Sequence, residues 1–319
     1  MLKRTLGRSG IEISAMGLGC WAIGGPFWRG DRGVGWSVVD DQESARAIRR
    51  ALDLGVTFFD TADVYGCGHS EHVLGRALGS RRDDVVVATK FGTTFDETSK
   101  QAGDGCGDPK YVRQACTDSL SRLGTEVIDL YQFHCADFDL SKAVAVRDTL
   151  EDLVDEGKIR WYGWSTDDPV RASLFAEGPH CAAVQQRFNV LEGNREMLRV
   201  CRDQHLASVN RSCLGMGLLT GKFDAATTFP KDDVRHGWDL KGGPQAELLA
   251  KLARVRDVLT AGGRTLAQGA LGWLWALSPA TIPIPGFKTV KQVEENAGAM
   301  SFGPLSADQM QQIDQILKS

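Results

Sequence analysis

The stretch that decides the fold is Val-Thr-Phe-Phe-Asp at residues 56–60, an apolar run that ends in a carboxylate. A pattern typical of an amphipathic helix precedes it at 43–54 and ends at Gly55, a residue that helix C-termini favour. A second helical pattern follows at 71–78. Helix, buried strand and helix in succession predict a parallel sheet covered by helices.

The same alternation continues to the end of the chain. We expect strands at 16–21, 58–61, 85–90, 128–134, 159–165, 183–188, 207–212 and 281–284. Helical patterns between them include 43–54, 71–78, 112–123, 144–156 and 195–204. Eight such units close naturally into a (β/α)8 TIM barrel, so residues 1–319 are predicted to form one barrel domain. A β-hairpin is expected ahead of the barrel, with strands at 4–6 and 11–13.

An open, doubly wound sheet is the alternative fold for this pattern. Such a sheet normally carries G-x-G-x-x-G after its first strand. Gly17 and Gly19 are followed by Cys-Trp-Ala, which does not match, and the segment 215–220 also lacks the third glycine. Residues 216–223 resemble half of a P-loop, but Met216 and Phe223 occupy two of its required positions. The barrel is therefore the better prediction.

Composition restricts the class of protein. The chain has 319 residues, a formal net charge of −4 and no block of like charges that would indicate a nucleic-acid partner. No apolar run approaches the roughly 20 residues that cross a bilayer, and the N-terminus lacks the apolar core of a signal peptide. We expect a soluble cytoplasmic protein.

The eight cysteines include no C-x-x-C pair, so we interpret them as reduced thiols. No further His or Cys cluster accompanies His69 and His72 to complete a metal site. The sequence does not indicate an oligomeric state.

Polar residues end four consecutive predicted strands: Asp60, Lys90, His134 and Ser165. In a barrel these strand ends meet at one mouth, where this fold has its active sites. Two long loops, 24–37 and 223–243, also follow strands and are expected to form walls or lids at that mouth. The aromatic residues predicted to contact substrate there are Trp21, Trp28 and Trp36.

Three of these stretches resemble the aldo-keto reductase family. They are Phe-Phe-Asp-Thr-Ala-Asp-Val-Tyr-Gly at 58–66, Ala-Thr-Lys-Phe-Gly at 88–92 and Asp-Leu-Tyr-Gln-Phe-His at 129–134. The resemblance implies reduction of a small carbonyl compound with NADPH, and a catalytic tetrad made of Asp60, Tyr65, Lys90 and His134.

The chemistry of these four residue types fits that reaction. Reduction of a carbonyl group requires a proton on its oxygen. A phenol, with its pKa of about 10, is a poor proton donor near neutral pH unless a neighbouring group stabilises the phenolate. We expect Lys90 to shift the pKa of Tyr65 toward working pH, Asp60 to keep Lys90 charged, and His134 to hold the substrate oxygen.

The resemblance also implies a cofactor site in the second half of the chain. Ser165 and Gln185 match positions that hold the nicotinamide amide, 212–222 matches a loop over the pyrophosphate, and 284–296 matches an adenosine clamp. Lys288 and Thr289 would bind a 2′-phosphate and favour NADPH. Phe188 is either a stacking residue or core. The predicted cofactor residues are Cys20, Trp21, Asp60, Ser165, Gln185, Ser212, Leu214, Gly215, Gly217, Lys222, Gly286, Lys288, Thr289, Gln292, Glu295 and Asn296.

Two other functions compete with this interpretation. The potassium-channel β-subunits resemble the same family and act chiefly as partners, so a complete tetrad is compatible with a regulatory protein that binds cofactor. A metal-dependent barrel hydrolase is the other alternative, but the sequence offers no convincing His/Asp ligand set.

Overall fold

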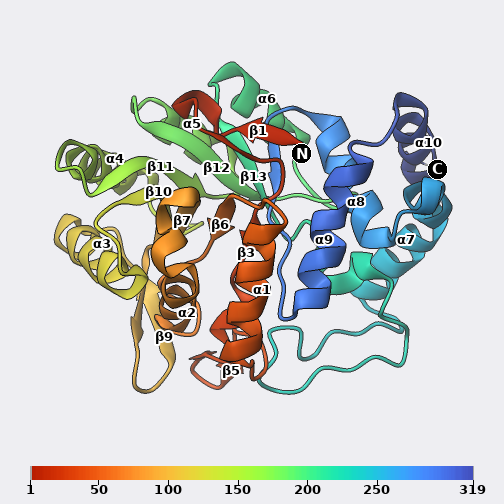
Figure 1. The fold of residues 1–319 in the computed structure, drawn as a ribbon, viewed down its shortest axis with the longest axis horizontal. Coiled ribbons are helices and arrows are strands. Elements are labelled where there is room, and N and C mark those ends of the chain that lie inside the picture. Colours follow the sequence, from red (N-terminus) through yellow and green to blue (C-terminus); the bar gives the residue numbers. More distant parts are fainter. Residues whose placement is uncertain (1, 319) are drawn as a thin grey trace.

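The computed structural model describes residues 2–318 and shows a ring of eight parallel strands surrounded by helices (Figure 1). The predicted barrel and all eight predicted strands are confirmed. In spatial order the strands are β3 (Leu18–Gly19), β6 (Phe58–Asp60), β7 (Val86–Phe91), β10 (Ile128–Phe133), β11 (Ile159–Ser165), β12 (Cys181–Arg187), β13 (Ala207–Arg211) and β14 (Thr281–Pro283).

The first and last barrel strands meet and close the ring. The backbone N–H groups of Gly17 and Gly19 donate to the carbonyls of Pro283 and Pro285, each at 3.0 Å. A side chain at position 19 could not be accommodated, because its Cβ would lie 2.8 Å from the carbonyl oxygen of Ile284. Glycine is therefore required where β3 approaches β14.

Helices form the outer layer and connect the strands. They are α1 (Asp41–Asp53), α2 (His69–Leu78), α3 (Pro109–Leu123), α4 (Leu140–Asp155), α5 (Pro169–Ala176), α6 (Arg195–Asp203), α7 (Pro244–Thr260), α8 (Leu266–Leu277), α9 (Val290–Phe302) and α10 (Ala307–Lys318). Short 3-10 turns are η1 (Gly7–Ser9), η2 (Ala22–Gly24), η3 (Gly79–Asp84), η4 (Gly215–Thr220) and η5 (Ala261–Gly263). An Asp or Asn side chain caps the N-terminus of several helices by accepting backbone N–H groups; these caps are Asp40, Asp108, Asp139, Asp168 and Asn194.

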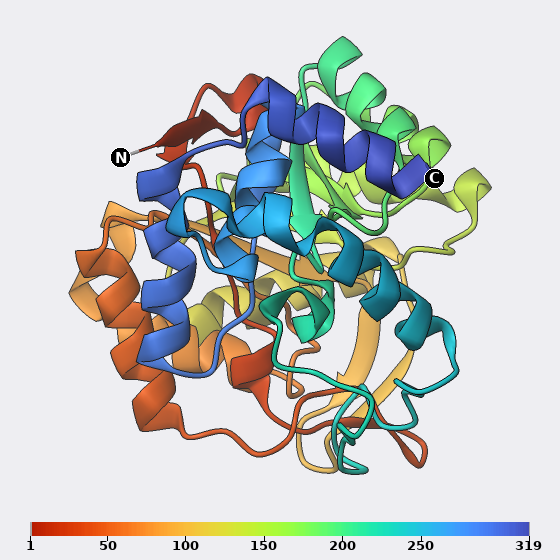
Figure 2. The same cartoon turned by 90° about the vertical axis from the view of Figure 1, so that its right-hand side faces the viewer.

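The predicted hairpin closes the N-terminal end of the barrel. Strands β1 (Lys3–Thr5) and β2 (Glu12–Ser14) are antiparallel, and η1 lies between them. Leu6 and Ile13 are buried against residues inside the barrel such as Phe58 and Leu130. Figure 2 shows this hairpin at the end of the molecule opposite the loops 24–37 and 223–243.

The opposite end carries a small second sheet that the sequence did not predict. Its strands are β4 (Trp28–Arg29), β5 (Arg32–Gly33), β8 (Thr93–Asp96) and β9 (Gln101–Gly105), in the order β5-β4-β9-β8. The loop 24–37, expected to be irregular, therefore contains a hairpin. Its register is fixed by pairing of Trp28 with Gln101 on another loop, a contact between distant segments that leaves no local pattern.

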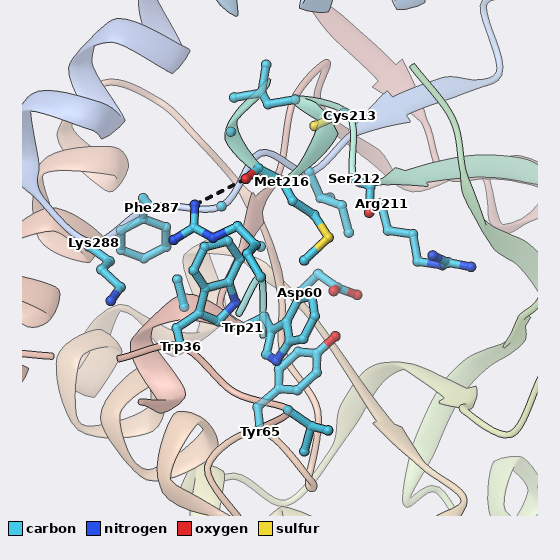
Figure 3. A pocket seen from close by; sticks show the side chains of 18 of the residues that line it. Trp21, Trp36, Asp60, Tyr65, Arg211, Ser212, Cys213, Met216, Phe287 and Lys288 are labelled. Carbon is cyan, nitrogen blue, oxygen red and sulfur yellow. Dashed lines mark hydrogen bonds between the residues drawn. The ribbon is translucent and has the colours of Figure 1, made fainter. Parts of the chain in front are cut away.

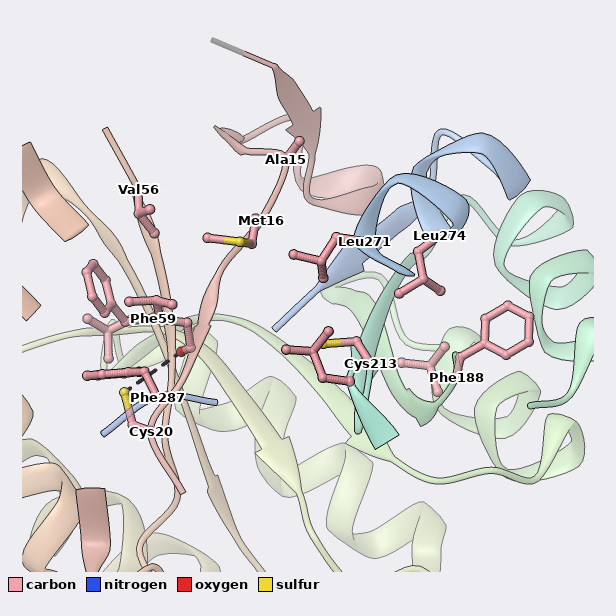
Figure 4. Packing of buried hydrophobic residues seen from close by; sticks show 14 of the residues in the cluster. Ala15, Met16, Cys20, Val56, Phe59, Phe188, Cys213, Leu271, Leu274 and Phe287 are labelled. Carbon is pink, nitrogen blue, oxygen red and sulfur yellow. Dashed lines mark hydrogen bonds between the residues drawn. The ribbon is translucent and has the colours of Figure 1, made fainter. Parts of the chain in front are cut away.

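A continuous apolar core lies between the strands and the helices. Met16 and Phe59 from the strand side and Leu271 from helix α8 belong to this one cluster (Figure 4). Barrel strand β7 is buried along its whole length because helices cover one face and other strands' side chains the other. Within residues 2–318 no helix is long and apolar enough to span a membrane. The eight cysteines are free thiols, as predicted.

Candidate active site

A cavity of about 640 Å³ opens at the carboxyl ends of the barrel strands. Side chains at or near the carboxyl ends of four of these strands line it: Asp60, Ser165, Gln185 and Arg211. Tyr65 lies on one side of this opening and Lys288 on another (Figure 3). The cavity is thus large enough to hold two small molecules end to end.

Three of the four predicted catalytic side chains are in direct contact. Lys90 Nζ donates to Asp60 Oδ1 at 2.6 Å, to the carbonyl of Thr61 at 2.6 Å and to the Tyr65 hydroxyl at 3.3 Å. The ammonium also lies 4.8 Å from the centre of the Tyr65 ring. Lys90 is 0% exposed and sits behind the cavity wall, so Asp60 and Tyr65 stand between it and the cavity.

The second carboxylate oxygen of Asp60 is held by two buried amides. Gln132 and Gln185 each donate from Nε2 to Asp60 Oδ2, at 3.0 and 2.8 Å. Gln185 lines the cavity as predicted, but its NH2 group is engaged by Asp60, which leaves its carbonyl oxygen for a ligand. Gln132 was missed by the sequence analysis. A second polar side chain, besides Asp129, inside the buried strand 128–133 was the available signal.

Burial and charge act in opposite directions on Lys90 and Tyr65. Burial lowers the pKa of Lys90, but Asp60 and Tyr65 outweigh it and raise that pKa above its usual value. Burial raises the pKa of Tyr65, and Lys90 reduces this rise without cancelling it. The expected influence of Lys90 on Tyr65 is present, yet the net pKa shift of the phenol is upward. Tyr65 therefore holds its proton at neutral pH.

His134 is placed beside Tyr65 as a neutral imidazole. The two rings are edge to face with centroids 6.0 Å apart. Burial, reinforced by the positive charges of Lys90 and Arg211, lowers the pKa of His134 to about 3. Its Nδ1 is buried and has no hydrogen-bond partner among the described residues. A neutral ring with an unpaired nitrogen can accept or donate one hydrogen bond to a ligand.

Two of the three predicted substrate tryptophans line the cavity. Trp21 stacks on Tyr65 with centroids 5.8 Å apart and meets Trp36 edge to face at 5.6 Å. Trp28 does not line the cavity, and its contact with substrate stays a prediction. Side chains alternate along β4, so Phe27 and Arg29 face the cavity while Trp28 faces away.

The segment 212–222 forms a tight loop along the cavity. Ser212, Leu214, Gly217 and Lys222 line the cavity, whereas the predicted Gly215 does not. Ser212 and Met216 adopt positive φ angles of 53° and 52° without being glycine. Such strained backbone persists where a function needs it, and turns of this kind direct N–H groups toward an anion.

The predicted adenosine clamp is only partly at the cavity. Gly286, Lys288, Gln292, Glu295 and Asn296 line it. Lys288 Nζ donates to the carbonyl of Ser37 at 3.0 Å.

Two predicted cofactor residues are used elsewhere. Thr289 caps α9 by accepting the N–H of Gln292, so its hydroxyl serves the helix and does not line the cavity. Cys20 is 0% exposed in the apolar core. Phe188 is likewise core, packed against Trp273.

The two long loops meet above the cavity. The backbone N–H of Val234 donates to the carbonyl of Gly35 at 2.8 Å. The guanidinium of Arg235 lies over the Trp36 ring at 4.4 Å and donates to the carbonyl of Met216 at 3.2 Å, the bond drawn in Figure 3. The loops predicted to be walls or lids thus join into a roof, and Arg235 was not predicted.

Arg211 is another charged wall residue that the sequence analysis missed, as is Arg29. It ends β13 and lines the same cavity as Tyr65 and His134. Ser208 and Asn210 interrupt the strand before it, so the rule that identified Asp60 and Lys90, a polar residue at the end of an apolar run, does not single out Arg211.

Comparison with known proteins identifies relatives of the whole chain. The sequence profile described as the Aldo/keto reductase family matches residues 15–318. Aldo-keto reductase YhdN of Bacillus subtilis is 31% identical over 98% of this chain and 92% of its own. The structure of glycerol dehydrogenase from Gluconobacter oxydans has a TM-score of 0.85, 31% identity, and coverage of 99% of this chain and 94% of that one. An aldo/keto reductase from Klebsiella pneumoniae in complex with NADP and acetate has a TM-score of 0.70, 26% identity, and coverage of 99% and 96%.

Proposed function

The chain belongs to the aldo/keto reductase family, and from that premise we propose that it reduces an aldehyde or ketone to the alcohol with NADPH. The observation that carries the proposal is the contact of Lys90 with both Asp60 and Tyr65 at the cavity that His134 also lines. An ammonium buried behind a phenol, with a carboxylate to keep it charged, is an arrangement suited to proton transfer.

Tyr65 is the general acid in this proposal. Its raised pKa keeps the phenol protonated at neutral pH, so the proton is present when a carbonyl oxygen arrives. As that proton leaves, negative charge develops on the phenolate oxygen, 3.3 Å from Lys90 Nζ. The ammonium stabilises this charge more strongly than it stabilises the neutral phenol, and so it lowers the barrier.

The other two groups hold the substrate and the ammonium in place. His134 donates a hydrogen bond to the carbonyl oxygen and stays neutral throughout, because its pKa of about 3 is far below working pH. Asp60 keeps Lys90 charged in a buried position, and Gln132 and Gln185 fix the orientation of its carboxylate.

Residues along the cavity wall suit a bound NADPH. NADPH supplies the hydride when bound. Backbone N–H groups of the 212–217 turn and the cation of Lys222 suit its phosphates, and the free carbonyl oxygen of Gln185 together with Ser165 suits the amide of its nicotinamide. The Klebsiella pneumoniae relatives in complex with NADP and NADPH support this choice. Lys288 favours NADPH over NADH, although Ser37 already occupies one of its donors.

The test is consumption of NADPH with 4-nitrobenzaldehyde by the wild type and by Tyr65→Phe. We expect repeated turnover by the wild type and a loss of kcat/KM of about 10²–10⁴-fold in the variant, typical of a lost general acid. Tyr162→Phe is the matched control, since the Tyr162 hydroxyl bonds Glu151 away from the cavity. NADH measured in parallel reports the cofactor preference.

Binding of NADPH, followed by its fluorescence, completes the test. Tyr65→Phe should bind NADPH like the wild type. Wild-type turnover in Tyr65→Phe would contradict the role of the phenol. A wild type that binds NADPH but fails to turn over across a broad carbonyl panel would instead favour a regulatory protein.

A further inference from the structure

Arg211 places a positive charge in the part of the cavity where the reaction is proposed. It is the last residue of β13, lines the cavity with Tyr65 and His134, and has a side chain that is 27% exposed. Its charge acts on both neighbours, because it contributes to lowering the pKa of His134 and opposes the rise in the pKa of Tyr65. Figure 3 shows its side chain extending beside Ser212, on the Asp60 side of the cavity.

The guanidinium uses only part of its hydrogen-bonding capacity. Its Nη2 donates to Asp167 Oδ2 at 2.6 Å, and within residues 2–318 this is its one hydrogen bond. The other oxygen of Asp167 is engaged by the backbone N–H of Arg187 at 2.6 Å. Asp167 itself does not line the cavity. Arg211 therefore presents unused donors to whatever enters.

The charge of Arg211 is also incompletely compensated. Burial lowers its pKa below the usual value, and Arg187 acts in the same direction, although Asp167 opposes both. A cation taken out of water without full pairing is costly, and a bound anion would relieve that cost.

Other unused polar groups at this end are donors or cations, alongside the free carbonyl oxygen of Gln185. The indole N–H groups of Trp21 and Trp36 are buried without a partner among the described residues. Arg29, on β4, is a further cation on the wall and forms no ion pair in the described chain. The acidic wall residues do not balance this, because Asp60 is paired with Lys90 and Glu295 belongs to the predicted adenosine clamp on α9.

We propose that the carbonyl substrate carries a carboxylate, which Arg211 binds while Tyr65 and His134 hold the carbonyl oxygen. The proposal rests on the proposed function. The planar fork of a guanidinium binds a carboxylate in a fixed orientation. Since Arg211 already shares its charge with Asp167, a singly charged carboxylate suits it better than a doubly charged phosphate ester. The apolar wall of Phe27, Val34 and Ala102 suits the carbon chain between the two groups.

The experiment compares acids with their neutral methyl esters. 4-Carboxybenzaldehyde and its methyl ester form a rigid pair, and 4-oxobutanoate and its methyl ester form a flexible one with a shorter span. We expect the wild type to prefer the acid in at least one pair by about tenfold or more in kcat/KM, the value of a charge-assisted hydrogen bond. Most of the preference should lie in KM, because the carboxylate is bound in both ground and transition states.

Three variants test the residue directly. Arg211→Met should abolish the acid-to-ester preference, and Arg211→Lys should keep part of it. Asp167→Asn, which removes the counter-ion, should raise the preference above that of the wild type. Arg202→Met, a 73% exposed arginine on α6, is the matched control and should leave the preference unchanged.

The outcomes separate this proposal from the one on which it rests. No turnover of any of the four aldehydes would contradict the proposed function. Turnover of acids and esters with equal efficiency would overturn the carboxylate proposal alone, as would a preference that survives in Arg211→Met. If Arg211→Met does not fold, the Asp167→Asn result decides, since an unchanged preference there overturns the proposal.

Discussion

The two ends of the barrel are built on opposite principles. At the N-terminal end, Leu6 and Ile13 of the hairpin segment pack on Phe58 and Leu130 in an apolar cluster. At the C-terminal end, a fully buried Lys90 is paired with Asp60, and the cavity-lining Trp21 and Trp36 have buried indole N–H groups without a partner among the described residues. The same eight strands thus carry an apolar, well-packed end and an end with buried charged and unpaired polar groups.

The difference shows how the barrel divides its tasks. Apolar burial at the closed end contributes stability of about 25 cal/mol for each Å² removed from water. The buried charges and unpaired groups at the open end cost free energy and are tolerated because the packed end compensates. Substitutions at the open end should therefore alter activity first, and substitutions at the closed end should alter stability first.

The largest effect is expected from Lys90→Met, because this substitution should change both activity and stability. Loss of the ammonium should reduce kcat/KM by at least about 10²-fold and lower the free energy of unfolding by about 3–5 kcal/mol, because Asp60 is left buried without its partner. The double variant Lys90→Met/Asp60→Asn is the control: denaturant unfolding should regain stability while steady-state assays regain no activity. A pH–rate profile identical to the wild type in Lys90→Met would contradict the proposed role.

A purely structural effect is expected at the closed end, from Leu6→Ala. Leu6 is 0% exposed, so the cavity left behind should cost about 2–5 kcal/mol in the free energy of unfolding. The kcat/KM measured below the melting temperature should stay at the wild-type value. Val38→Ala, at a 78% exposed side chain, is the comparison and should change neither property. Lost activity in folded Leu6→Ala would show that the two ends are coupled.

The smallest effect is a pH dependence of stability at the open end. The folded pKa of His134 is about 3 against about 6.5 when unfolded, so the unfolded state binds the proton more tightly. Stability contributed by His134 is complete above pH 6.5 and falls as the pH drops toward 3, by about 2 kcal/mol at pH 5.

His134→Asn should remove this part of the acid sensitivity. Urea unfolding at pH 7 and pH 5 measures it. His205→Asn, at an exposed turn, should keep the wild-type pH slope. An unchanged slope in His134→Asn would mean that His134 does not stay neutral in the folded protein.

The features predicted best from the sequence are those that a pattern within one segment encodes. Apolar strands that alternate with capped helices gave the barrel, and polar strand ends gave Asp60, Lys90 and His134. The small sheet of β4, β5, β8 and β9 escaped prediction because its strands are short and polar and exist only through pairing between distant loops. A pattern within one segment carries no information about such a contact.

The site was predicted unevenly for a similar reason. The positions of Trp28, Cys20 and Thr289 in the sequence predicted that all three lie at the mouth of the barrel. Only the three-dimensional backbone shows that Trp28 does not line the cavity, that Cys20 lies in the core and that Thr289 caps a helix. Gln132 and Arg211 were missed because each lies in a strand segment that contains other polar residues, so neither stands out. Their importance follows from neighbours, Asp60 and the cavity, that lie far from them in sequence.

The meeting of β3 with β14 has a consequence for the chain's synthesis. The bonds that close the ring join Gly17 to Pro283 and Gly19 to Pro285, so roughly nine-tenths of the chain must leave the ribosome before the ring can form. Until then β3 is a strand with an unpaired edge, and such edges promote aggregation. Because β3 is only two residues long, its unpaired edge exposes few backbone groups with which another chain could pair.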